Sequence, residues 1–458
     1  MIVQFTSKYF VCDNICENIL NTKFIVPLYF YFNFAHLAFK KMTPITKNLQ
    51  YYKFCLYGFF KNLRFFDAFL VLFFMDKGIG YLEIGLLYST REIAIMLMEI
   101  PSGFIADALG RKRTLIFSFF FYILSFLIFY YSSSLLLLFA AITMFAVGDA
   151  FRTGVHKAMI FQYLKVNGWA AQRVNYYGHT RSWSQFGSAI SALIAGFIVF
   201  YSEAIDSVFL WSIVPYLFDV LLIASYPNFL DGEIKPQKLS TIKEQFRAVW
   251  KGFLISFKLP KTTKALLSTS LFSGYYSAIK DYIQPLIKTL AISIPVVTYL
   301  NNEQKTAFMI GIIYFFIYLL TAVASRLSGR ITNLFSNPLQ PMNLSLIVGF
   351  GVGIIGFSFY EFGIYAFPIG AFLVIMMIEN MRKPLGIALV AELSEDEAMA
   401  SVLSVTSQAK SLITAIIAAL TGWMADIHGL PIALTAMSMG LLIIYPLYRL
   451  KAKPNRTK

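Results

Sequence analysis

Residues 103–131 of the chain read GFIADALGRKRTLIFSFFFYILSFLIFYY. The second part of this stretch, residues 114–131, has no charged side chain, and it directly follows the basic cluster Arg111, Lys112 and Arg113. A helix needs about 20 apolar residues to cross the roughly 30 Å hydrocarbon core of a bilayer. Apolar runs close to that length recur along the chain, so the sequence predicts a protein that crosses a membrane many times.

The composition supports the same class of protein. Hydrophobic residues make up 58% of the 458 positions and charged residues only 14%, whereas a soluble domain has about 25% charged residues. Backbone groups in lipid must bond within their own segment, and no short alternating strands of a barrel are evident, so the spans are expected to be helices. The net charge of +15 lies in loops rather than in a patch with interleaved aromatics, and it does not predict nucleic-acid binding.

The hydropathy pattern predicts an all-α membrane protein with about twelve transmembrane helices. The longest polar stretch, residues 227–264, divides them into two six-helix halves at 49–226 and 265–450, with a basic tail at 451–458. Residues 1–48 form an N-terminal extension, and Met42 is the expected natural start. The spans are predicted near 53–75, 84–106, 114–131, 135–155, 179–201, 207–226, 265–288, 307–325, 342–360, 362–381, 400–424 and 430–449.

Basic residues fall on one side of this map. The other side carries only Lys77, Lys288 and Lys305. Cytoplasmic loops retain Lys and Arg, so both termini and the central loop are expected in the cytoplasm. The residues that decide this are Arg111–Arg113, Lys157, Lys165, Arg173, the basic residues between Lys235 and Lys264, Arg326, Arg330, Arg382, Lys383 and those from Arg449 to Lys458.

The turn after the second span resembles the G-x-x-x-D-R-x-G-R-K signature of the major facilitator superfamily. It is formed by Gly103, Asp107, Gly110, Arg111, Lys112 and Arg113, after Glu99-Ile-Pro101-Ser102. Gly103 permits close helix approach, Asp107 can pair with basic groups, and Gly110 permits a tight turn. The resemblance implies the major facilitator fold and a latch that closes the cytoplasmic side. Ala108 replaces the usual basic residue, which removes one ion pair of that latch.

Two further segments are weaker copies of this pattern. The corresponding turn of the second half has Gly329-Arg330, but Arg326 stands where an aspartate is expected. Gly422, Asp426 and Gly429 repeat the glycine and aspartate spacing at the outer end of span eleven, where they are interpreted as a structural turn.

Charged residues inside spans are costly, by about 2.5–3.5 kcal/mol at the helix centre, and they therefore indicate a wet cavity or a partner. They concentrate on spans one, four, seven and ten, which line the central cavity in the family that the chain resembles. Spans two and eleven add further polar groups. The candidate cavity residues are Arg64, Asp67, Arg91, Glu92, Asp149, Arg152, Lys280, Asp281, Gln284, Glu379, Arg382 and Lys410.

Some of these charges have a structural alternative. Arg64 with Asp67, and Asp149 with Arg152, are each three residues apart and could neutralise each other on one helix face. Lys410 has no acidic neighbour in its own span and needs a partner from another helix or a substrate anion. His156 is interpreted as a hydrogen-bonded histidine near the interface rather than a proton relay.

The sequence therefore predicts a secondary transporter that moves a small polar or amphipathic solute by alternating access, coupled to protons. Asp67, Asp149 and Asp281 are the candidate coupling carboxylates, and Arg64, Arg152, Lys280 and Lys410 the candidate substrate-orienting cations. The alternatives are a multidrug-type proton antiporter and, more remotely, a non-transporting receptor or scaffold. No nucleotide-binding loop or catalytic motif is present, so neither a cofactor nor a metal is expected. We expect a monomer in the bacterial inner membrane.

Overall fold

A computed structural model describes residues 45–232, 234, 260–294, 299–333, 335, 337, 339–392 and 399–450. Most of the predicted N-terminal extension and central loop, and the whole basic tail, lie outside the described residues, so the predicted domain boundaries there stay predictions. The described part of residues 47–458 is helical, with no strand among its assigned elements.

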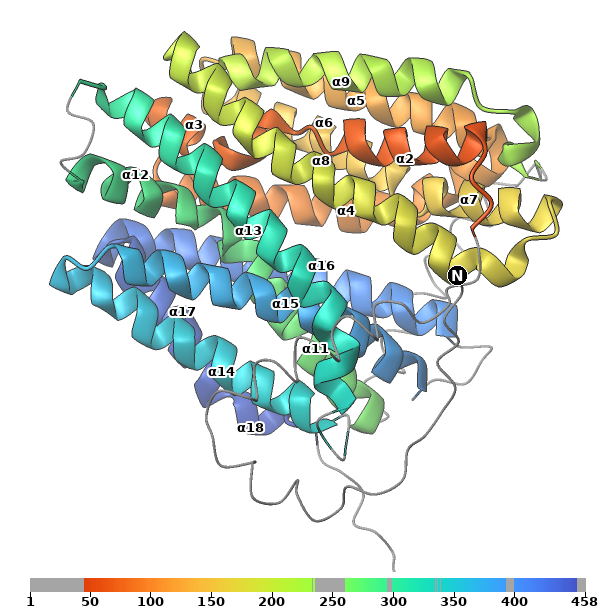
Figure 1. Cartoon of the computed structure of the whole chain (residues 1–458). Helices are drawn as coiled ribbons and strands as arrows, with labels where there is room; N and C mark the ends of the chain where they lie inside the picture. Colours follow the sequence, from red (N-terminus) through yellow and green to blue (C-terminus); the bar gives the residue numbers. More distant parts are fainter. Residues whose placement is uncertain are drawn as a thin grey trace, which may run out of the picture. The chain divides into compact units, whose positions relative to one another are not determined.

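The first group of helices follows the first six predicted spans (Figure 1). Span one is divided into three short helices rather than one, and a separate helix, α7, stands between spans four and five. The elements are α2 (Leu49–Lys61), η1 (Phe65–Ala68), α3 (Leu70–Asp76), α4 (Tyr81–Leu109), α5 (Arg111–Tyr131), α6 (Leu135–Arg152), α7 (Val155–Val166), η2 (Ala170–Gln172), α8 (Arg173–Ser202), α9 (Ser207–Ala224) and η3 (Asn228–Asp231).

The second group follows the other six predicted spans in the same way. Here span seven is divided, at η4. The elements are α11 (Pro260–Ile279), η4 (Lys280–Tyr282), α12 (Ile283–Ser293), α13 (Asn302–Asn333), α14 (Leu339–Ser358), η5 (Phe359–Phe362), α15 (Ala366–Glu392), α16 (Met399–His428), α17 (Leu430–Ile443) and α18 (Tyr445–Tyr448).

Seven helical segments in the described part are long and apolar enough to cross a membrane. They correspond to predicted spans three, four, five, six, eight, nine and eleven. Of the other five spans, α4 and α15 are long but interrupted by charged residues, spans one and seven are broken into shorter helices, and α17 has 14 residues. Most of the spans with interior charge are therefore the ones that depart from a simple apolar rod.

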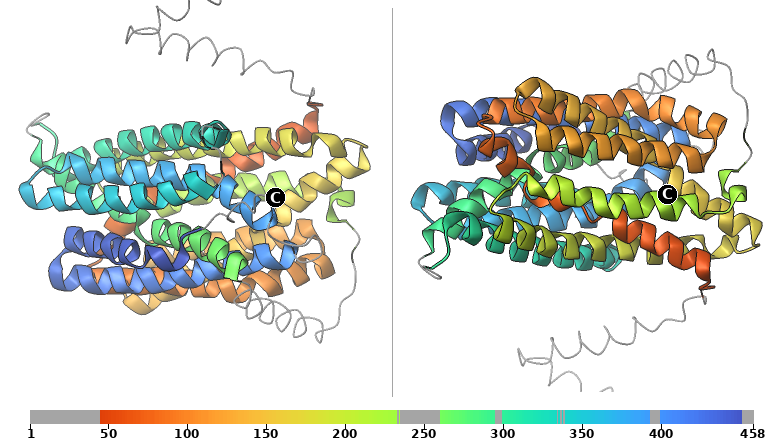
Figure 2. Two further views of the ribbon diagram at one scale, coloured as in Figure 1. Left: turned by 90° about the horizontal axis from the view of Figure 1, so that it is seen from below. Right: turned by 90° about the horizontal axis from the view of Figure 1, so that it is seen from above.

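Two helix pairs join the groups. Helix α4 packs along α16, and α8 packs along α13. Figure 2 shows the helices of both groups running side by side in a common direction. Small residues permit the first contact, because a Cβ at Gly85 would collide with the carbonyl of Ala418, and one at Gly422 with the carbonyl of Tyr81.

The predicted continuous helices at spans one and seven are wrong in an informative way. The first helix, α2, ends at Lys61, and its cap residue Asn62 donates a side-chain amide N–H to the carbonyl of Gly58 over 2.7 Å. The chain then continues through Arg64 in a non-helical conformation before η1 begins. Span seven breaks at Lys280 and Asp281. Both breaks fall on charged residues, and discontinuous membrane helices are typical of transporter binding sites.

Candidate functional site

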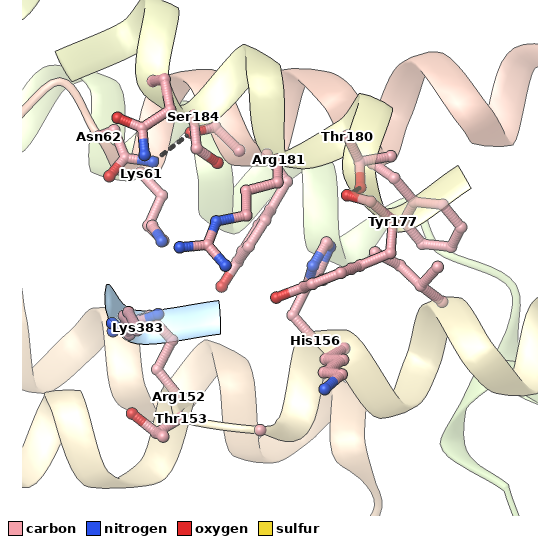
Figure 3. A pocket seen from close by; sticks show the side chains of 17 residues that line it. Lys61, Asn62, Arg152, Thr153, His156, Tyr177, Thr180, Arg181, Ser184 and Lys383 are labelled. Carbon is pink, nitrogen blue, oxygen red and sulfur yellow. Dashed lines mark hydrogen bonds between the residues drawn. The ribbon is translucent and has the colours of Figure 1, made fainter. Parts of the chain in front are cut away.

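The main polar cavity lies against the first group of helices, at the end of the bundle that carries α7. Its volume is about 440 Å³, and its walls come from α2, α6, α7, α8 and, on the opposite side, Lys383 of α15 (Figure 3). A cavity of this size is within the range of small-molecule sites, about 300–1,000 Å³. It is therefore the candidate substrate site.

Basic side chains dominate this cavity. Figure 3 shows the charged ends of Lys61 and Arg181 directed toward the space that Lys383 faces from the other side. No aspartate or glutamate is among the lining residues. The basic residues of the lining are Lys61, Arg152, His156, Lys157, Arg181 and Lys383.

Local structure explains how α6 and α7 present their residues. Helix α6 ends at Arg152, and Gly154 has a φ of +82°, a conformation that glycine adopts without strain. The chain then restarts as α7, which places His156 in the wall. Its ring stacks on Tyr57 with centroids 3.6 Å apart, and its Nε2 lies 3.2 Å from the Tyr226 hydroxyl. This agrees with the interpretation of His156 as a hydrogen-bonded histidine.

Beside the cavity lies an ion cluster centred on Asp149, which is buried. Arg152 donates to Oδ1 over 2.9 Å and Arg64 over 3.4 Å, while Arg91 donates to Oδ2 over 3.2 Å. Tyr122 also donates its hydroxyl to Oδ1. The predicted Asp149–Arg152 pair is thus present, but Arg64 pairs with Asp149 and not with Asp67.

Asp67 lies in a small cavity next to this cluster, together with Arg64 and Tyr318. Its carboxylate has no hydrogen bond or ion pair within the described part of the chain.

The candidate residues of span seven make hydrogen bonds with their neighbours. Lys280 donates to Asp281 over 2.7 Å. Gln284 accepts from the backbone N–H of Val71 over 2.8 Å and donates to the carbonyl of Asp67 over 2.9 Å. Gln284 therefore ties α12 to the break in span one.

In α15, two predicted cavity residues have very different surroundings. Arg382 is buried and donates to the carbonyls of Met342 and Ser268 and to the Ser345 hydroxyl, so it connects α15 to α11 and α14. Glu379 accepts from Ser273 at Oε1 over 2.7 Å, while its buried Oε2 has no partner in the described residues.

Polar contacts also run along the α4–α16 interface. Ser411 donates to Glu92 over 2.9 Å, and Gln408 donates to Glu99 over 3.0 Å. The ammonium of Lys410 makes no hydrogen bond or ion pair within the described residues, so the partner or substrate anion expected for it stays a prediction.

The motif after α4 is held by its own half in this conformation. Gly110 has a φ of +94°, and the backbone N–H of Lys112 donates to Asp231 over 2.6 Å. Asp107 is exposed and has no ion pair among the described residues, and a Cβ at Gly103 would meet no atom within 4 Å. The close helix approach expected at Gly103 is therefore not made in this conformation.

At the opposite end of α4, hydrogen bonds join this helix to α16. Both oxygens of Asp426 accept backbone N–H groups at the start of α4, from Tyr81 and Leu82, each over 2.9 Å. A carboxylate at a helix N-terminus is stabilised by the free N–H groups and the helix dipole. The segment interpreted from sequence as a simple turn thus joins α16 to α4.

Of the predicted cavity residues, only Arg152 lines the main cavity; Arg64 and Asp67 line the small one. Sequence reasoning missed Lys61, Lys157, Arg181 and Lys383 as cavity residues. The available signal was that Lys61, Lys157 and Lys383 lie on or beside the lining spans one, four and ten, whereas Arg181 lies on span five. The charges of Lys157 and Lys383 were instead used for orientation.

This arrangement defines a multi-pass helical membrane protein with a polar cavity that Lys383 of the second bundle faces. The family model of the Major Facilitator Superfamily matches residues 54–418. The chain therefore belongs to this superfamily, and it is a membrane transporter rather than an enzyme. None of the proteins with curated descriptions matches the chain.

Three solved structures with the same fold are distant from this chain in sequence. A mutant of the nucleoside transporter NupG has a TM-score of 0.71 at 12% identity, covering 87% of this chain and 98% of that one. A POT family transporter in complex with 5-aminolevulinic acid has a TM-score of 0.65 at 13% identity, covering 87% and 95%. A bacterial homolog of the human lysosomal transporter Spinster, in an inward-facing state, has a TM-score of 0.65 at 14% identity, covering 88% of this chain and 97% of that one.

Proposed function

We propose that this protein is a proton-coupled secondary transporter that moves a small polar solute across the bacterial inner membrane by alternating access. The termini and α7 would lie in the cytoplasm. The observation that carries the proposal is the difference between the two ends of the bundle. A polar, basic cavity that Lys383 of the second half faces lies at the α7 end. At the other end hydrogen bonds join the two halves beside a mostly apolar cavity of about 490 Å³.

The closing contacts come from both halves. Asp426 of α16 caps the start of α4, and Gln284 of α12 bonds the backbone around the break in span one. Breaking such contacts while the cavity end closes would expose the same site to the other side of the membrane.

Proton coupling requires a carboxylate that can gain and lose a proton without dismantling the fold. Asp149 is bound by three guanidinium groups and Asp281 by Lys280, so protonation of either would break ion pairs. Glu379 has a free oxygen, and Asp67 has no ion pair in the described part of the chain. We therefore assign coupling to Glu379 and Asp67.

The test uses purified protein in proteoliposomes that contain a pH-sensitive dye. Sugars, organic acids, peptides and nucleosides are added one at a time, with an imposed pH gradient. The expected result is that at least one solute moves protons with it. Solute flux that is unchanged after a protonophore dissipates the gradient would contradict proton coupling.

The direction of transport needs a separate measurement. Uptake into right-side-out vesicles indicates an importer, and uptake into inverted vesicles indicates an exporter. Accumulation of lipophilic drugs only in inverted vesicles would favour the multidrug antiporter, which remains the alternative.

A further inference from the structure

We propose that the substrate is a small oxyanion with two or more negative charges, such as a phosphate ester or a polycarboxylate, held in the basic cavity. This inference rests on the proposed transport function and specifies the substrate class for the same site. It is carried by the basic residues of the cavity wall, which includes no aspartate or glutamate among its lining residues.

The basic residues of the cavity wall differ in the groups that lie beside their charged ends. Arg152 is bound to Asp149 and Tyr122, and Lys157 lies 5.4 Å from the ring centres of both Phe161 and Tyr177. The charged ends of Lys61, Arg181 and Lys383 have no hydrogen bond or ion pair within the described residues. We call these three residues the free cations.

Lys61 is half-buried, while Arg181 and Lys383 are exposed at the open cavity. Three cations around one cavity repel each other. Water can solvate them when the cavity is open, but closure of the cavity removes that water. A solute with several negative charges would compensate the three cations at that step. Neutral and cationic solutes would leave them uncompensated, so the cavity discriminates by charge.

The positions of the free cations connect binding to conformational change. Lys61 of α2 and Arg181 of α8 belong to the first half, whereas Lys383 of α15 belongs to the second. An anion that contacts both sides replaces repulsion between the halves by attraction at this end. It therefore favours the conformation in which the cavity is closed, which is the differential binding that alternating access requires.

Neutral donors complete the site around these charges. Ser184 and Asn62 also line the cavity, and the Ser184 hydroxyl and the second N–H of the Asn62 amide can donate hydrogen bonds to oxygen atoms of a ligand. Carboxylate and phosphate oxygens accept from Arg and Lys in short, charge-assisted bonds. The shared chemistry is thus an oxyanion, and the experiment distinguishes the phosphate from the carboxylate source.

The experiment measures binding and thermal unfolding of the full-length protein in a neutral detergent. The probes are inorganic phosphate, a hexose 6-phosphate and a tricarboxylate, with the unmodified hexose and a neutral tripeptide as counterparts. A ligand that binds only the folded state raises Tm according to its affinity. We expect at least one anion to raise Tm, and neither neutral compound to do so.

Each free cation is expected to contribute to the affinity for that anion. The variants Lys61→Gln, Arg181→Gln and Lys383→Gln should each raise the Kd of the anion about tenfold, as for the loss of one charge-assisted hydrogen bond. Lys77→Gln is the matched control, because it removes one positive charge at the opposite end of the bundle. This variant should bind the anion as the wild type does.

Two results would overturn the inference. The first is that no anion raises Tm; the second is that an anion binds the wild type and all three variants equally. Flux of a neutral solute in the proteoliposomes would leave the transport function standing and refute only the anion assignment. Anion binding that depends on the free cations, but without flux of any solute, would keep the site and refute transport.

Discussion

Asp149 in the first half and Glu379 in the second are both buried carboxylates on helices that line the space between the bundles, yet their partners differ. Asp149 is held by Arg64, Arg91 and Arg152 and by a tyrosine hydroxyl. Glu379 has one serine on one oxygen and no partner on the other in the described residues.

This difference in partners indicates a structural role for Asp149 and a proton-transfer role for Glu379. A carboxylate with three guanidinium partners can lose one contact and still be compensated, and its charge is needed to balance theirs. A carboxylate with one neutral partner can change its charge at little structural cost. We infer that the Asp149 cluster holds α4, α6 and the break in span one together, while Glu379 is available for proton transfer.

The largest expected effect on stability is that of Asp149→Asn, which leaves three half-buried guanidinium groups without their buried acid. Loss of one partner of a buried ion pair costs about 3–5 kcal/mol. Thermal unfolding of the detergent-purified variant should show this as a strongly lowered Tm and a low yield of folded protein.

Arg91→Lys is the control for that prediction. It keeps the charge and removes only one of the three guanidinium contacts, so the cost should be about 1 kcal/mol. An Asp149→Asn protein as stable as the wild type would show that the cluster does not anchor the first half.

A smaller loss is expected for Arg382→Met. The buried guanidinium donates to the carbonyls of Met342 and Ser268 and to the Ser345 hydroxyl, and an apolar side chain removes these hydrogen bonds from α15 to α14 and α11. The expected cost is about 2 kcal/mol, measured by the same unfolding experiment. Lys383→Met, one residue along the same helix but in the cavity wall, should change Tm little. Equal losses in the two variants would contradict a structural role specific to Arg382.

Glu379→Gln should have the smallest effect on stability, below about 1 kcal/mol, because the amide oxygen can still accept from Ser273. Its effect on transport is expected to be large. Accumulation driven by a pH gradient should be lost, while exchange of solute at equal pH continues. If gradient-driven accumulation persists in this variant, the coupling proton is carried elsewhere, and Asp67→Asn is the next test.

Several features of the fold could be predicted from the sequence because they depend on local properties. The helical class follows from the length of the apolar runs, and the superfamily from the turn around Gly110 and Arg111; both predictions are confirmed. The Asp149–Arg152 pair could also be anticipated, since three-residue spacing places both side chains on one helix face.

Other features depend on contacts between distant segments. Arg64 was matched with Asp67 by spacing, but the break after Asn62 turns it toward Asp149 on another helix. Lys61, Arg181 and Lys383 lie in three different spans, and hydropathy gives each only a position along the membrane axis. Nothing in their local sequence indicates that they share one cavity.

The sequence by itself determined that this chain is a helical membrane protein with charged lining spans, because the cost of charge in lipid acts on each segment separately. The tertiary structure decided which charges neutralise each other and which remain free, because Coulomb energies depend on distances between segments that fold together. The anchored Asp149, the open oxygen of Glu379 and the three free cations are all consequences of that packing.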